Sequence, residues 1–60
     1  MIRYYTVSGD TRNGHDFEYL FYHYRDAKKK YDSIQTGSGI TYKSLTATDD
    51  KEGDQILERE

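Results

Sequence analysis

The sequence predicts an α+β fold of the order ββαββ, in which two β-hairpins flank one helix and form a four-stranded antiparallel sheet with the helix on one face. Two runs of turn-forming residues, 9–14 and 49–53, each lie between segments rich in β-branched and aromatic side chains, as in hairpins. Between the hairpins, the composition changes within two residues, from mostly aromatic at 17–24 to Arg, Ala and Lys at 25–31, which favour helix.

The first hairpin is predicted to pair residues 2–8 with residues 16–24. The segment 2–8 (IRYYTVS) has the β-branched and aromatic content of a strand, and the turn that follows it contains Asn13-Gly14, a strong hairpin signal.

The stretch 17–34 also fits a second interpretation, because its apolar residues recur at helical spacing. That stripe consists of Phe17, Leu20, Phe21, Tyr24, Ala27, Tyr31 and Ile34. The alternative fold is then βαββ with one long helix at about 14–35. We favour a strand followed by a helix at 25–35, because a run of aromatic residues fits a pleated sheet and loses rotamer freedom in a helix. Gly37-Ser38-Gly39 is predicted to stop this helix.

The second hairpin is predicted to pair residues 40–48 with 54–60, with a turn at 49–53 that ends in Gly53. The 60 residues are expected to form a single domain, and a domain of this size buries only about 60% of the surface of its unfolded chain. Hydrophobic and charged residues each make up 33% of the chain, but 15% is aromatic, and a few buried rings can replace a larger aliphatic core.

One sheet face is predicted to be covered and the other exposed. Alternation along the second strand points Phe17, Tyr19 and Phe21 towards the helix. It points Leu20, Tyr22 and Tyr24 away, where no second helix exists to cover them. A contiguous exposed aromatic patch is typical of an interaction surface, although tyrosines also lie half exposed on many solvated sheets. The predicted partner-binding residues are Leu20, Tyr22, Tyr24 and Tyr5.

The alternative function is binding of single-stranded nucleic acid, with tyrosines stacking bases and Arg25, Lys28 and Lys29 contacting phosphates. Two properties weaken it: consecutive helical residues lie about 100° apart, so the three adjacent lysines cannot share a face, and the chain has a net charge of −2.

Charge is segregated along the chain. Residues 49–60 contain six acids and two bases (−4), whereas residues 25–32 contain four bases and two acids (+2).

Catalysis, metals and cofactors are not expected. The chain has no Cys, and its four serines, Ser8, Ser33, Ser38 and Ser44, have no general base with an orienting acid nearby in sequence. His15 and His23 would lie about 27 Å apart on one strand, too far to share an ion.

The sequence therefore predicts a non-catalytic protein-binding module that acts on a protein partner or by self-association as a homodimer. Its size and composition are similar to those of small accessory proteins of phages and mobile elements. No segment has the ~18 apolar residues that a membrane span requires, and the absence of Cys fits a cytoplasmic protein.

Overall fold

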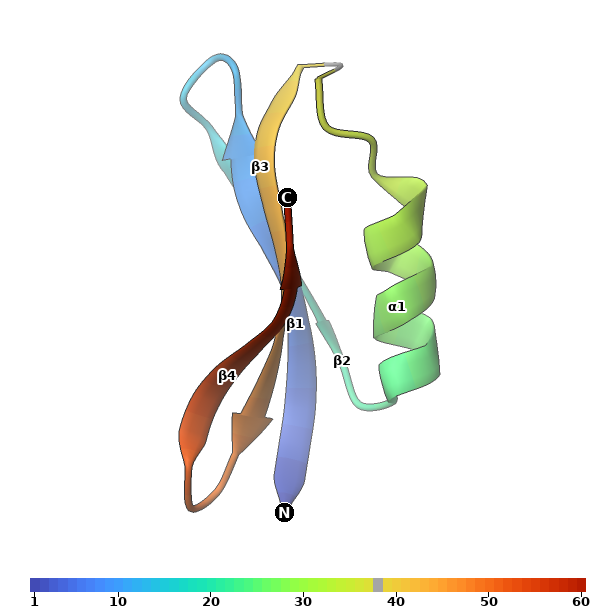
Figure 1. Cartoon of the computed structure of the whole chain (residues 1–60), viewed down its shortest axis with the longest axis vertical. Helices are drawn as coiled ribbons and strands as arrows, with labels where there is room; N and C mark the ends of the chain where they lie inside the picture. Colours follow the sequence, from blue (N-terminus) through green and yellow to red (C-terminus); the bar gives the residue numbers. More distant parts are fainter. Residues whose placement is uncertain (38) are drawn as a thin grey trace.

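The structure, a computed structural model, describes residues 1–37 and 39–60. Its elements in chain order are β1 (Ile2–Thr11), β2 (Asp16–Phe21), α1 (Tyr24–Ser33), β3 (Ile40–Asp49) and β4 (Gly53–Arg59). The strands form one antiparallel sheet in the order β2-β1-β3-β4, and α1 packs on one face (Figure 1). The predicted ββαββ fold is confirmed, and the alternative with a long helix from residue 14 is wrong.

The first hairpin closes through a short turn. The Thr11 N–H donates to the His15 carbonyl (2.8 Å), and the Gly14 N–H donates to the Thr11 carbonyl (3.0 Å). Gly14 has a φ of 84°, a conformation that glycine adopts more readily than any other residue. From there β1 and β2 pair without a register shift, from Asp10 opposite Asp16 to Tyr5 opposite Phe21.

The second hairpin turns around the Asp49 carboxylate, which accepts the N–H groups of Lys51 (2.8 Å) and Glu52 (3.2 Å). The N-terminal ammonium of Met1 lies 3.0 Å from the same carboxylate. The Lys51 N–H, then the ammonium and the Glu52 N–H, lower the pKa of Asp49 to about 2.

The boundaries of β2 and α1 differ from the prediction. β2 ends at Phe21, three residues earlier than expected, and α1 starts at Tyr24 after an extended His23. The helix ends at Ser33 because Ile34 is extended (φ −91°, ψ 126°), before the glycine stretch that was predicted to stop it. Ser38 of that stretch lies outside the described residues.

The C-terminal end of α1 is held by Lys43 of β3. Its Nζ donates to the carbonyls of Tyr31 (2.7 Å) and Ile34 (2.6 Å) and lies 4.0 Å from the centre of the Tyr31 ring. It also pairs with the Glu60 carboxylate (3.2 Å). Lys43 is only 4% exposed, so these acceptors replace the water that its charge would otherwise require. In return, carbonyls at the helix end gain a donor that the helix cannot supply.

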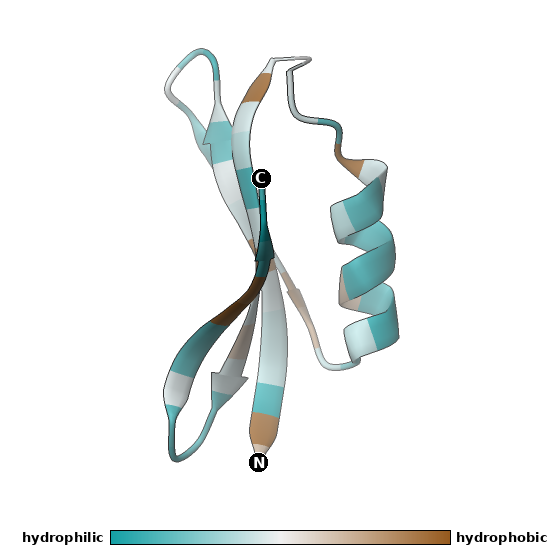
Figure 2. Cartoon of the chain, in the orientation of Figure 1, coloured by the Kyte–Doolittle hydropathy of each residue, from teal (hydrophilic) through white to brown (hydrophobic). Residues whose placement is uncertain are grey.

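The core lies between α1 and the two central strands and is small. Figure 1 views the sheet nearly edge-on, with β4 nearest and α1 on one side only. Figure 2 shows that most of α1 is hydrophilic, so a narrow stripe of the helix makes this contact. The buried cluster is Val7, Ala27, Tyr31 and Leu45, with Tyr5, Phe21 and Ile34 packed around it.

Candidate functional site

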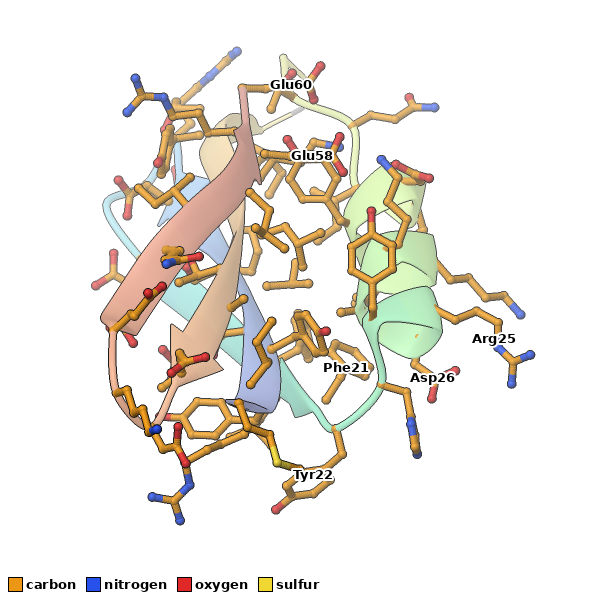
Figure 3. The ribbon with its side chains drawn as sticks, turned by 60° about the horizontal axis from the view of Figure 1, so that its bottom comes forward. Phe21, Tyr22, Arg25, Asp26, Glu58 and Glu60 are labelled. Carbon is orange, nitrogen blue, oxygen red and sulfur yellow. The ribbon has the colours of Figure 1, made fainter. Side chains whose placement is uncertain are left out.

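The four residues predicted to bind a partner do not share one surface. Leu20 lies opposite Thr6 on the uncovered face and is 51% exposed. Tyr22 follows the end of β2, is 73% exposed and points away from the molecule (Figure 3). Tyr24 belongs to α1, and its ring packs edge to face on the half-buried Tyr5, with centroids 5.7 Å apart, on the helix side. The predicted placement of Tyr22 and Tyr24 beside Leu20 is wrong, because the strand stops before it reaches them.

The uncovered face has a floor of hydroxyl side chains, which sequence reasoning missed. A visible signal was the alternation of Ser or Thr with buried residues along β1 and β3. The floor consists of Thr6, Ser8, Ser44, Thr46 and Thr48. The Ser8 and Ser44 hydroxyls bond each other (3.2 Å). The tyrosines of this face are Tyr4 and Tyr42, both half-buried and paired with Thr48 and Asp10.

The lysines of α1 divide between the two flanks of the helix. Lys28 faces β4, where its Nζ contacts the Glu58 carboxylate (2.7 and 2.8 Å) and the Asp32 carboxylate (3.1 Å). Glu58, and then Asp32, raise the pKa of Lys28 above its ordinary value. Lys30 faces β2, with its ammonium 4.3 Å from the centre of the Tyr19 ring. Of the residues predicted to contact phosphate, Lys28 is thus bound within the chain.

The hollow between α1 and the end of β4 is lined by charged residues that pair with each other within the chain. It measures about 350 Å³ and includes Lys43, Glu58 and Glu60 in its lining. Figure 3 shows Glu58 and Glu60 at the end of β4 beside the helix. Part of the acidic segment 49–60 is therefore already matched by bases of the same chain, which leaves this hollow poorly suited to a charged partner.

The two edge strands offer different surfaces. In β4 the register with β3 shifts between Leu45 and Thr46, which leaves Leu57 as an extra residue, and such bulges disrupt further pairing. The register of β2 with β1 runs through six consecutive pairs without a shift. Within the described residues, no element pairs with the outer edge of β2.

The outer edge of β2 presents backbone groups of known direction. Because the Thr11 N–H bonds the His15 carbonyl, antiparallel alternation directs the N–H and C=O groups of Tyr19 and Phe21 towards β1. The corresponding groups of Glu18 and Leu20 then point outwards. An incoming strand would find two donors and two acceptors there.

A groove adjoins this edge on the helix side. It has a volume of about 430 Å³ and is lined by Phe21 of β2 and by Asp26, Lys29, Lys30 and Ser33 of α1. Figure 3 shows Phe21 turned under the helix, and Arg25 and Asp26 pointing outwards near its start. The groove combines an apolar floor with a rim that carries two lysines.

The other side of the same edge is acidic. Asp10 and Asp16 face each other at the end of the hairpin, and Glu18 follows on the same face. Interaction with the Asp16 carboxyl group raises the pKa of Asp10, as expected for two acidic groups held close together. A cation beside this edge would relieve their repulsion.

Comparison of the chain with protein-family models, curated proteins and solved structures gave no match. No group of three or more His, Asp or Glu side chains in the described part of the chain is arranged to hold a metal ion. In residues 1–37 and 39–60, no helix has the length and apolar character needed to cross a bilayer.

Proposed function

We propose that the protein is a non-catalytic protein-binding module that captures an extended segment of a partner along the outer edge of β2. The observation that carries the proposal is the regular, unbulged edge with an open groove beside it, between Phe21 and the Lys29–Lys30 side of α1. Strand addition of this kind gains affinity from backbone hydrogen bonds and specificity from pockets that take alternate side chains.

The edge has the chemistry that strand addition requires. The outward groups of Glu18 and Leu20 are held in an extended line because the neighbouring residues Tyr19 and Phe21 pair with β1, so the partner alone must be ordered on binding. Tyr19, which is 43% exposed and lies against the Lys30 ammonium, adds an aromatic surface beside the groove, and aromatic residues are enriched at the centres of interfaces.

Leu20 keeps the partner-binding role predicted from the sequence. It contributes its backbone to the edge and its side chain to the uncovered face. Tyr22 lies in the bend that follows Phe21 and is 73% exposed, so its ring is accessible to a partner bound at this end of β2. Tyr5 of β1 and Tyr24, the first residue of α1, support the site from the helix side of the sheet, where their rings pack on each other.

Binding of single-stranded nucleic acid remains the second prediction from the sequence. The pairing of Lys28 with Glu58 occupies one of the three residues, Arg25, Lys28 and Lys29, that were predicted to contact phosphates. A fluorescence titration with mixed oligonucleotides at two salt concentrations tests it, and binding that weakens steeply with salt would support it.

A cytoplasmic location also stays a prediction, which fractionation of host cells tests.

Selection from a random heptapeptide display library tests the proposed function. We expect the selected peptides to bind the wild-type protein and Leu20→Ala, and to lose at least about tenfold in affinity for Leu20→Pro. Only proline removes the outward N–H, and edge strands tolerate proline where the N–H faces solvent. The comparison with alanine isolates this backbone donor from the side chain.

Circular dichroism and amide NMR spectra establish that Leu20→Pro is folded, and Glu18→Pro replaces it if the fold is lost. The proposed function is overturned if the selected peptides bind the folded proline variant as tightly as the wild type. It is also overturned if their amide shift changes lie away from β2 and α1.

A further inference from the structure

The two sides of the β2 edge carry opposite charge. On the helix side, the groove is lined by two basic residues, Lys29 and Lys30, and by one acidic residue, Asp26. On the uncovered side, the acidic residues Asp16 and Glu18 of β2 lie on the same face of the sheet as Leu20. Successive side chains of a strand point to opposite faces of the sheet. A fifth strand paired with β2 would therefore place alternate side chains beside the basic groove and the residues between them beside the acidic face.

From this complementarity we propose that the partner is an extended segment whose side chains alternate in charge. Acidic residues and one apolar residue face α1, and basic residues face Asp16 and Glu18. This inference rests on the proposed function and adds the chemistry of the segment to it.

The helix side selects for acidic side chains around a central apolar one. The groove of about 430 Å³ lies within the size range of sites that take a small ligand or side chain. Its apolar floor at Phe21 and the neighbouring Tyr19 ring favour an apolar residue there. Lys30 approaches that ring to 4.3 Å, so a carboxylate placed two residues before or after the apolar residue can reach an ammonium group.

The uncovered side selects for basic side chains. Asp16 meets Asp10 across the hairpin, and this contact raises the pKa of Asp10. Glu18 is on the same face. Lys or Arg directly beside them forms the opposite-charge cross-strand pairs that stabilise sheets, whereas Asp or Glu there repels.

The charges argue against a second copy of this chain as the occupant. If two β2 edges paired antiparallel about a twofold axis, both helices would lie on the same face of the joined sheet. Lys29 and Lys30 of one copy would then approach the same lysines of the other, and the acidic sides would also meet. Like charges brought together in this way oppose association.

A designed heptapeptide probes the proposal. The probe is acetylated and amidated Lys-Glu-Arg-Val-Lys-Glu-Thr, which presents Glu, Val and Glu on one side and Lys, Arg and Lys on the other. Its control is Lys-Lys-Glu-Glu-Arg-Val-Thr, which has the same composition and net charge without the alternation. Titration into ¹⁵N-labelled protein gives the affinities and locates the bound peptide.

We expect the alternating peptide to bind at least about tenfold more tightly than the control, with the largest amide shifts at Glu18 and Leu20. Lys30→Glu should weaken the alternating peptide at least about tenfold, while the matched charge change Lys51→Glu, in the far turn, should leave it unchanged. Leu20→Pro should abolish binding, and Leu20→Ala should retain it.

The charge inference is overturned if the permuted peptide binds equally well, or if Lys30→Glu has no effect. If library-selected peptides still depend on the Leu20 N–H in that case, the proposed function stands while the charge pattern fails. If sedimentation shows a dimer that Leu20→Pro dissociates, the occupant is a second copy and the inference is wrong.

Discussion

The edges of the sheet, β2 and β4, are equally exposed by topology, but the chain treats them differently. β4 is bulged, and at its C-terminal end Glu58 and Glu60 pair with Lys28 of α1 and Lys43 of β3. β2 is regular, and its outward backbone groups lie between a basic groove and an acidic face. Glu58 and Glu60 thus pair within the chain, whereas under the proposed function the charged residues around β2 contact a partner. Three substitutions test this division.

The largest effect on stability is expected at Lys43 of β3, which pairs with Glu60 at the end of β4. Lys43→Met keeps the length of the side chain but removes the donor to the Tyr31 and Ile34 carbonyls. Hydrogen bonds that involve a charged group contribute about 1.5–3 kcal/mol each, and the uncharged methionine avoids the cost of burying an ammonium group, so we expect a net loss of about 2–3 kcal/mol. The total free energy of unfolding of a chain of this length is about 3–9 kcal/mol. Urea denaturation measures the loss.

Lys29→Met is the matched control, because it makes the same substitution at an exposed position of α1. It should change the free energy of unfolding by less than about 0.5 kcal/mol. Equal effects of the two substitutions would contradict the role assigned to Lys43.

An intermediate effect that depends on pH is expected in the β3–β4 turn. The folded pKa of Asp49 is lowered to about 2, below the value of about 3.9 for an unfolded Asp. Its contribution is therefore present above about pH 4 and is lost as the pH falls towards 2. Asp49→Asn should be less stable than the wild type at pH 7, and the difference should narrow between pH 4 and pH 2. Thermal melts across this range measure it.

Asp50→Asn, one residue further along the same turn, serves as the control. The Asp50 carboxylate contacts the N-terminal ammonium (2.9 Å), whereas that of Asp49 also accepts two turn amides. A gap between Asp49→Asn and the wild type that stays constant from pH 7 to pH 2 would show that charge on Asp49 is unimportant.

The smallest effect on stability is expected at the β2 edge. Leu20 is half exposed on the uncovered face, so Leu20→Ala should change the free energy of unfolding by no more than about 0.5 kcal/mol. A loss above about 2 kcal/mol in urea denaturation would place Leu20 in the core and remove the distinction between the edges.

Much of the fold was predictable because its signals are local. Asn13-Gly14 and the acidic run ending at Gly53 marked the turns, and the change from aromatic residues to Arg, Ala and Lys marked the passage from β2 to α1. The alternation in β2 correctly placed Phe21 on the helix side and Leu20 on the other. The end of β2 was not predictable from composition, because Tyr22 has the same strand preference as Tyr19.

The candidate site was only partly predictable for a related reason. Adjacent lysines look alike in the sequence, and the rotation of α1 on the sheet decides that Lys28 meets Glu58 while Lys30 meets Tyr19. The sequence indicated Leu20 as a binding residue. It did not show which strand would be at the edge or that a groove would lie beside it.

The sequence by itself determined the kind and order of the five elements, since turn chemistry and side-chain periodicity act between near neighbours. The tertiary structure alone decided the strand order β2-β1-β3-β4, and with it the position of β2 at an edge. It also decided which lysines are bound within the chain, because Lys28 and Glu58 are 30 residues apart and Lys43 and Tyr31 are 12 apart. Contacts over such separations depend on how the helix packs on the sheet, and the pattern of neighbouring residues in the sequence does not predict that packing.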